Sequence, residues 1–137
     1  MMHIRTYIPS DQAAVVALWT DVFGYPTPYN DPAKVIHNKL SVQPELFFVA
    51  AVNEQVVGTV IGGYDGHRGW IYSLAVNSQY RHLGIGSALM RHVEAALIGL
   101  GCPKINLQVL NTNAEVVSFY EKMGYRVEER VSMGKIV

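Results

Sequence analysis

The residues best suited to chemistry form a loop, Arg81-His82-Leu83-Gly84-Ile85-Gly86, between an apolar run and a helix-like spacing. The first turn of a helix has backbone N–H groups without intrahelical acceptors, and the helix dipole adds partial positive charge there. Gly84 and Gly86 would let a ligand approach the backbone, and Arg81 adds a fixed positive charge. This stretch is therefore predicted to bind an anion, and phosphate is the usual guest of such sites.

Two common phosphate-binding patterns do not fit this loop. A dinucleotide loop needs G-x-G-x-x-G in the first βαβ unit, but the sixth position is Leu89 and two predicted strands come earlier. A nucleoside triphosphate loop needs G-x-x-x-x-G-K-[ST], which the chain lacks. The pattern that remains is [RQ]-x-x-G-x-[GA] after a strand. A tight turn from strand to helix, without any ligand, is the alternative.

The elements that must position the loop follow from hydrophobic spacing. Residues 70–76 are apolar, aromatic and β-branched and predict a buried strand, which residues 77–80 link to the loop. After Gly84, apolar residues recur every three or four positions on one helix face, and Gly101 ends that helix. The apolar positions of this face are Ile85, Ala88, Leu89, Val93, Ala96, Leu97 and Leu100.

The rest of the chain predicts an antiparallel part before the loop and a shorter part after the long helix. Further strands are expected at residues 4–8, 46–52, 56–64, 105–109 and 125–131. Further helices are expected after Ser10 or Asp11, from Asp31, and after Thr112, which fits a capping box with Glu115. Gly62-Gly63 inside a strand indicates a bulge or a close backbone approach. The loop at residues 25–30 could wall a pocket or be an exposed connector.

Composition narrows the class of protein. The 137 residues suit one domain, residues 1–137, and half of them are hydrophobic. Zero formal net charge argues against nucleic-acid binding, and no apolar run is long enough to predict a membrane span. The single cysteine, Cys102, excludes an intrachain disulfide and a cysteine zinc cluster, so no metal is expected. Without a signal-peptide h-region at the N-terminus, a cytoplasmic protein is expected.

A second pattern, N-x₆-Y-x₃-G, is formed by Asn113, Tyr120 and Gly124 within the stretch 111–125. The loop and this pattern, in this order and about 30 residues apart, resemble the two motifs of the GNAT superfamily of N-acetyltransferases. Three stretches resemble the narrower bacterial YpeA-like acetyltransferases: residues 30–32, 63–69 and 101–104. The resemblance implies an α/β (α+β) three-layer fold. It also implies a mixed sheet of six or seven strands with an antiparallel N-terminal part, and about four helices.

The resemblance further implies an acetyl-CoA-dependent transfer of an acetyl group to a primary amine, by direct attack in a ternary complex. The backbone of Leu74, Ala75 and Val76 would pair with the pantetheine arm like an added strand. Asn113 would hydrogen-bond that arm, and Tyr120 would lie near the sulfur and protonate the leaving thiolate. The residues implied around the pyrophosphate are Arg81, His82, Leu83, Gly84, Ile85, Gly86 and Ser87.

Each of these residues also has a purely structural interpretation. Tyr120 could be a core aromatic residue and Asn113 part of a helix cap. His82 could contribute only its backbone amide, and the strand residues would be core with or without a ligand. No carboxylate lies on the strand before the loop, so the general base stays open among Asp65, His67, Tyr72 and water.

Three functional classes are therefore compared. An acetyltransferase is the leading hypothesis, and an acyl-CoA-binding sensor or partner module with little catalysis is the alternative. A nucleotide-binding α/β domain fits the motifs least well. The acceptor expected from the resemblance is a small-molecule amine or a protein amine. A homodimer through an exposed strand edge or the C-terminal strand stays open.

Overall fold

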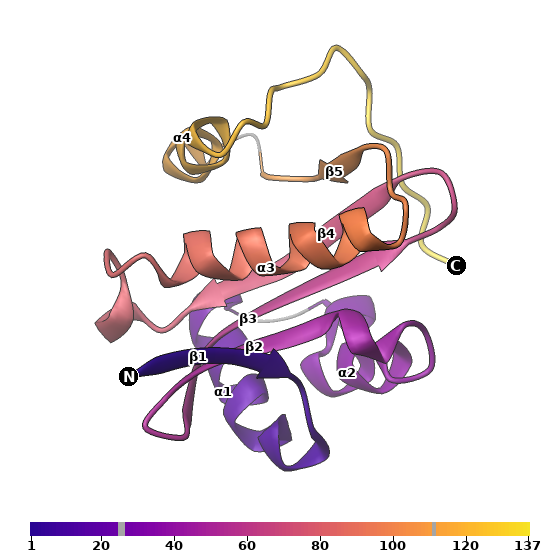
Figure 1. The fold of residues 1–137 in the computed structure, drawn as a ribbon. Coiled ribbons are helices and arrows are strands. Elements are labelled where there is room, and N and C mark those ends of the chain that lie inside the picture. Colours follow the sequence, from indigo (N-terminus) through magenta and orange to yellow (C-terminus); the bar gives the residue numbers. More distant parts are fainter. Residues whose placement is uncertain (25–26, 111) are drawn as a thin grey trace. The chain divides into compact units, whose positions relative to one another are not determined.

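The protein is described here as a computed structural model that covers residues 1–24, 27–110 and 112–137. These residues fall into two units, residues 1–107 and residues 108–137, and each is described by itself. The strands are β1 (Met2–Thr6), β2 (Phe47–Val52), β3 (Gln55–Tyr64), β4 (Gly69–Val76) and β5 (Ile105–Leu107) (Figure 1). The helices are α1 (Gln12–Phe23), α2 (Pro32–Lys39), α3 (Ile85–Gly99) and α4 (Ala114–Lys122).

The first unit contains one mixed sheet in the order β1-β2-β3-β4-β5. The first four strands are antiparallel neighbours, and β5 runs parallel to β4 over the three pairs from Gly69↔Ile105 to Ile71↔Leu107. A two-residue turn, Asn53-Glu54, joins β2 to β3, and both residues have positive φ (50° and 66°). Such a turn matches the twist of the hairpin strands. The antiparallel N-terminal part expected from the sequence is therefore confirmed.

Helices cover both faces of this sheet. On one face, α1 and α2 pack over a core that the sheet shares with them. Its buried members are Tyr7, Val15, Leu18, Trp19, Ile36, Phe47, Val49, Ile61 and Ala75. On the other face, α3 buries Ile85, Leu89, Met90, Val93 and Leu97 against β2, β3 and β4. The periodic apolar face predicted from Ile85 onward is thus the face that holds α3 on the sheet. Leu100, predicted on the same face, is 48% exposed because it lies beyond the end of α3.

The expected number of strands, six or seven, is wrong for the described residues, which form five. Residues 125–131 contain no strand, and the region predicted as a strand at 105–109 ends at Leu107. Within residues 125–131, Val127 is 79% exposed and Val131 87% exposed. A strand forms only where its backbone groups find a neighbouring strand, and the second unit offers none in its described residues. The β-branched residues at 125–131 were therefore not sufficient for a strand to form there.

The helix caps agree with the predicted ones in part. The side chain of Asn113, not Thr112, caps α4 by accepting a hydrogen bond from the backbone N–H of Val116 at 3.4 Å. Asp31 caps α2 as predicted, accepting from the backbone N–H of Lys34 at 3.2 Å. Asp11 precedes α1, but its carboxylate makes no cap there and is engaged elsewhere. The helices themselves lie where hydrophobic spacing predicted them.

Asp11 links β1 to the start of α1 through a partly buried ion pair with Arg5. Its two carboxylate oxygens accept from Arg5 Nη1 at 2.8 Å and Arg5 Nη2 at 2.9 Å, and the backbone N–H of Ile8 donates to Oδ2 at 2.9 Å. Hydrogen bonds from the Arg5 guanidinium, aided by the Ile8 N–H, hold the pKa of Asp11 below its ordinary value. A carboxyl whose pKa is lower in the folded protein stabilises the fold above its unfolded pKa.

We therefore expect Asp11→Asn to lower the free energy of unfolding at pH 7 by about 1–2 kcal/mol. The Asp11 contribution is fully present above pH ~4, the ordinary pKa of aspartate, and is lost as the pH falls through the depressed folded value. The two proteins should accordingly converge in stability as the pH falls below about 4. Urea unfolding measured from pH 7 to pH 3 checks this, and a gap that stays constant with pH would contradict it.

Candidate functional site

The predicted anion loop forms the entry to α3. Gly84 occupies the N-cap position with φ 82° and ψ 8°, a left-handed conformation that glycine adopts without strain. No side chain caps α3, and its first turn contains no acidic residue. The loop residues Arg81 to Gly84 are exposed. The backbone N–H groups at the start of α3 are thus left for an external acceptor, as an anion site requires.

Arg81 connects this loop to the end of β4. Its Nε lies 3.4 Å from the carbonyl oxygen of Val76. The link between them contains the short 3₁₀ helix η4 (Ser78–Tyr80), which Asn77 caps by accepting from the Gln79 N–H at 2.9 Å. Asn77 N in turn donates to the carbonyl of Val57 at 2.8 Å. The loop is therefore anchored to β3 through the Asn77 N–H and to the end of β4 through Arg81.

A bulge interrupts β4 just before the loop. Thr59 of β3 pairs with Ala75, whereas Ile61 pairs with Tyr72, so β4 contains one residue more than β3 between these pairs. Ser73 has φ 53°, the left-handed conformation that a non-glycine residue rarely adopts. Bulges of this kind bend a strand and redirect its backbone groups. Of the two alternatives predicted for Gly62-Gly63, the bulge is therefore wrong, since the extra residue lies on the partner strand. The close approach is confirmed at Gly62, where an added Cβ would lie 2.6 Å from Val93 Cγ2.

A buried relay of hydrogen bonds holds this bulge in place. Thr59, which is fully buried, accepts from Trp19 Nε1 at 2.8 Å and donates to the carbonyl oxygen of Ser73 at 2.9 Å. Trp19 belongs to α1, so the helix fixes the β4 backbone through one threonine side chain. A buried carbonyl in a bulge would otherwise lose its hydrogen bond at a free-energy cost of about 1–3 kcal/mol.

One edge of β4 is left open beside the loop. In the described residues, pairing with β5 ends at Ile71↔Leu107. Asn77 directs its N–H to β3, and alternate residues of a strand point their backbone groups to opposite edges. The backbone groups of Val76 and Leu74 therefore face the edge away from β3. Ala75 differs from its neighbours because its side chain is buried in the core on the α1 and α2 face.

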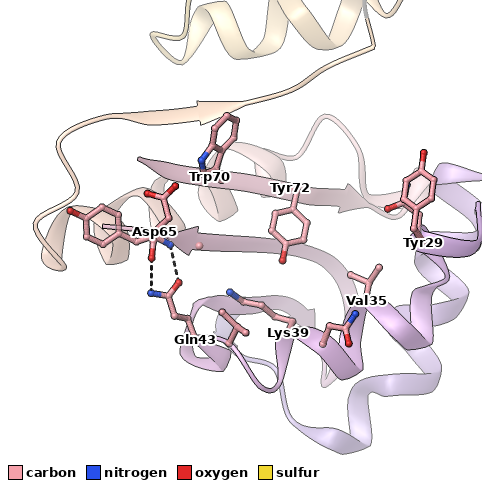
Figure 2. A pocket seen from close by; sticks show the side chains of 12 residues that line it. Tyr29, Val35, Lys39, Gln43, Asp65, Trp70 and Tyr72 are labelled. Carbon is pink, nitrogen blue, oxygen red and sulfur yellow. Dashed lines mark hydrogen bonds between the residues drawn. The ribbon is translucent and has the colours of Figure 1, made fainter. Parts of the chain in front are cut away.

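The first unit also contains a pocket of about 530 Å³ on the α2 side of the sheet. Figure 2 shows the side chains that line it, among them Lys39, Gln43 and Tyr72. The full lining is Tyr29, Asn30, Val35, Asn38, Lys39, Val42, Gln43, Gly63, Tyr64, Asp65, Trp70 and Tyr72. Part of the predicted loop 25–30 thus does wall a pocket, while Tyr25 and Pro26 lie outside the described residues.

Two side chains of this pocket complete the edge of β3 past Ile61, where its pairing with the first residue of β2, Phe47, stops. Lys39 Nζ donates to the carbonyl of Gly62 at 2.6 Å. Gln43 donates to the carbonyl of Tyr64 at 3.0 Å and accepts from the Tyr64 N–H at 2.8 Å, the contacts drawn as dashed lines in Figure 2. Neither residue was predicted as part of a site. A lysine in the last turn of a helix ordinarily stays in solvent and interacts with the helix dipole, so no sequence signal distinguishes Lys39.

The candidate bases differ in their surroundings. Asp65 Oδ1 accepts from the backbone N–H groups of Arg68 and His67, each at 2.7 Å, and these bonds lower the pKa of Asp65. Tyr72 lines the pocket, and burial raises its pKa above the ordinary value for tyrosine. His67 is exposed in the turn and is not part of the pocket lining. A carboxylate held by two N–H donors and a phenol with a raised pKa are both weak proton acceptors at neutral pH.

Asn113 and Tyr120 belong to the second unit, which is described by itself. Tyr120 lies on α4, partly buried, with its ring 5.2 Å from that of Phe119 and 5.9 Å from that of Tyr125. Burial raises the pKa of Tyr120, so its hydroxyl keeps its proton at neutral pH. Gly124, with φ 98°, follows the end of α4. Asn111, the first residue of the second motif stretch, lies outside the described residues.

This chain is similar to acetyltransferases in both sequence and fold. The Acetyltransferase (GNAT) family pattern matches residues 13–125. An acetyltransferase of Sodalis glossinidius is 46% identical over 132 residues, 95% of this chain and 91% of that protein. An N-acetyltransferase of Yersinia pestis is 43% identical over 136 residues, 98% and 94% of the two chains. The crystal structure of PaiA N-acetyltransferase from Thermoplasma acidophilum in complex with coenzyme A superposes with a TM-score of 0.82 at 20% identity, covering 96% and 93% of the chains.

The helix-covered mixed sheet therefore has the same fold as that structure. The chain belongs to the GNAT family of acetyltransferases and is an N-acetyltransferase. No helix in residues 1–24, 27–110 and 112–137 is both long enough and apolar enough to cross a membrane.

Proposed function

We propose that the protein transfers the acetyl group of acetyl-CoA to a primary amine by direct attack in a ternary complex. The observation that carries this proposal is the juxtaposition of two backbone surfaces that the described residues leave largely unpaired, the exception being the Val76 carbonyl, which accepts from Arg81 Nε at 3.4 Å. The uncapped start of α3 at Gly84 can receive an anion, and the open edge of β4 at Leu74 and Val76 can pair with an extended amide chain. Coenzyme A has both features, a pyrophosphate and an amide-containing arm.

The proposed cofactor site joins these two surfaces. The backbone of Leu74, Ala75 and Val76 would lie along the pantetheine arm, with the outward groups of Leu74 and Val76 as its hydrogen-bond partners. Asn113 would add a hydrogen bond from α4 beyond its role as a cap. The pyrophosphate would be held by Arg81, His82, Leu83, Gly84, Ile85, Gly86 and Ser87. The bound coenzyme A in the PaiA structure supports acyl-CoA as the cosubstrate.

In the proposed reaction, the amine nitrogen forms a bond to the thioester carbonyl carbon as the carbon–sulfur bond breaks. A backbone N–H at the open edge of β4, close to the bulge, would stabilise the negative charge that develops on the carbonyl oxygen. The hydroxyl of Tyr120 would donate its proton to the departing sulfur. Its raised pKa favours this role, because a donor must hold its proton until the step in which it is used.

We further propose that water, rather than a carboxylate, removes the proton from the amine. Asp65 is the single carboxylate in the described pocket lining, and two backbone N–H groups already stabilise its charged form. Tyr72 keeps its proton at neutral pH for the reason given above. The pocket has a volume of about 530 Å³, which is room for water that could pass the proton to solvent.

The absence of an evident base among the described residues also favours a second candidate, an acyl-CoA-binding sensor or partner module with little catalysis. The two candidates differ in one measurable product. An enzyme releases free thiol from acetyl-CoA in proportion to the concentration of an added amine, whereas a sensor binds acetyl-CoA and releases none. A thiol assay over a panel of amines therefore separates them.

The first test of the cofactor site is thermal unfolding with acetyl-CoA, CoA, ATP and NAD in parallel. At a hundredfold excess over Kd, a ligand stabilises the fold by about 2.7 kcal/mol, which raises Tm by about ten degrees at this size. We expect this rise with the two CoA ligands and not with ATP or NAD. Gly84→Val should abolish most of it, because a β-branched residue is strained at φ 82° and its side chain would stand over the α3 N-terminus.

The matched control is Gly99→Ala, in the last turn of α3, where an added Cβ meets no atom within 4 Å. It should keep the full Tm rise with acetyl-CoA. If neither CoA ligand shifts the Tm of the wild-type protein at millimolar concentration, the proposed cofactor site and the proposed reaction with acetyl-CoA fall together.

The subgroup within the family, the acceptor and the cellular location are also part of this proposal. We infer membership of the YpeA-like subgroup, supported by 43–46% identity to bacterial acetyltransferases over nearly the whole chain. The acceptor is proposed to be a small-molecule or protein amine. A cytoplasmic location and a single domain over residues 1–137 stay predictions from the sequence, and a homodimer stays open.

A further inference from the structure

The pocket beside β4 contains the ammonium group of Lys39, whose hydrogen-bond donors the fold only partly pairs. Lys39 is 4% exposed, and lysine is almost never so buried unless its charge is paired. Its ammonium group has three N–H donors, and within the described residues its hydrogen-bond acceptor is the carbonyl of Gly62. No salt bridge joins Lys39 to a carboxylate in that part of the chain. Two donors are thus available to a ligand in the pocket that Lys39 lines.

The surroundings of Lys39 favour an anionic partner. Burial lowers the pKa of Lys39, and the more distant Glu45 carboxylate opposes this effect only through its charge. Asp65, the carboxylate of the lining, is engaged by the backbone N–H groups of its own turn. A ligand carboxylate that accepts from Lys39 would supply the missing countercharge in a partly desolvated site, where such a hydrogen bond is stronger than in water.

The pocket also has the size and position of a small-molecule site. Its volume of about 530 Å³ lies within the range of ligand pockets, and Tyr29, Trp70 and Tyr72 give it aromatic walls. Figure 2 shows Tyr72 extending from β4 toward the side of the pocket where Lys39 lies. Tyr72 is followed directly by the bulge at Ser73, and Leu74 lies about 7 Å further along the strand. A ligand anchored at Lys39 can therefore reach the open edge of β4.

Resting on the proposed function, we propose that the acetyl acceptor is a small amine that also carries a carboxylate, as an amino acid does. Lys39 binds the carboxylate at the base of the pocket, and the amine points along β4 toward Leu74. The alternative role for Lys39 is purely structural. It would complete the edge of β3 at Gly62, as Gln43 does at Tyr64, two residues further along that strand. The test must therefore use a readout that a structural tie would not change.

Pairs of amines that differ only in the carboxylate provide this readout, for example L-phenylalanine with 2-phenylethylamine and L-lysine with cadaverine. We expect kcat/KM of the wild-type protein to be about 10- to 10²-fold higher for carboxylate-bearing members of the accepted pairs. Lys39→Met should remove most of this preference and leave kcat/KM for the descarboxy amines and KM for acetyl-CoA within about twofold. Gln43→Met is the matched control, since it loses strand-edge bonds but no charge, and it should keep the preference.

Three results would overturn the inference. The wild-type protein could accept both members of each pair equally, Lys39→Met could lower both activities in parallel, or no carboxylate-bearing amine could release thiol. In each case, a Tm rise with acetyl-CoA would leave the cofactor site of the proposed function standing. Failure of that rise together with absence of thiol release would instead remove the proposed function itself.

Discussion

Tyr120→Phe is expected to lower kcat by about 10²- to 10⁴-fold at neutral pH, with KM for acetyl-CoA changed little. The expectation rests on the proposed role of the Tyr120 hydroxyl as the proton donor to the departing sulfur. Burial raises the pKa of Tyr120 above the ordinary value of 10.0, so the donor is in its protonated form throughout the neutral range. The wild-type kcat should then fall only above about pH 10, and the variant should lack that fall.

Tyr7→Phe is the matched control for this prediction. The Tyr7 hydroxyl is buried without a hydrogen-bond partner in the described residues, and its ring stacks on Phe47 at 4.4 Å. Removing that hydroxyl should leave kcat unchanged and raise, not lower, the free energy of unfolding. If Tyr120→Phe keeps the wild-type kcat across the pH range on a good acceptor, Tyr120 is a core aromatic residue and the donor is another group or water.

Gly62→Ala is expected to lower the free energy of unfolding by about 1–3 kcal/mol, although alanine adds one methyl group. A Cβ at position 62 would lie 2.6 Å from Cγ2 of Val93 on α3, closer than two carbon atoms can approach. Since Val93 is fully buried, α3 would have to shift on the sheet. Gly63→Ala is the control on the opposite face, because its Cβ would meet Gln43 and Lys39 at ordinary contact distances of 3.8 and 3.9 Å.

A double-mutant cycle makes this prediction specific. Val93→Ala alone should also destabilise the protein, because it leaves a cavity under α3. Combined with Gly62→Ala, it makes room for the new methyl group, so the double variant should be more stable than the sum of the two single changes predicts by at least about 0.5 kcal/mol. Chemical denaturation of the four proteins measures this coupling. Strict additivity would show that α3 does not press on β3 at Gly62.

The sequence by itself determined the elements and the family. A spacing of three or four residues located α3 and its buried face, and the two glycines at its start predicted an uncapped helix N-terminus, which Gly84 forms. The hairpin and the antiparallel order of the strands before the loop also followed from local patterns. These features depend on residues close together in the chain, so short-range patterns specify them. The two GNAT motifs could be recognised in the sequence because each is also a short-range pattern.

The features that only the tertiary structure decided depend on partners far apart in the chain. The bulge lies at Ser73, where the Thr59 hydroxyl, 14 residues away, donates to the Ser73 carbonyl and is itself held by Trp19, 54 residues from Ser73. Lys39 became a pocket residue because β2 begins at Phe47, opposite Ile61, and leaves the carbonyl of Gly62 for it. Residues 125–131 did not become a strand, since β-branched residues form strands only beside a partner. Spacing along the chain does not encode these long-range choices.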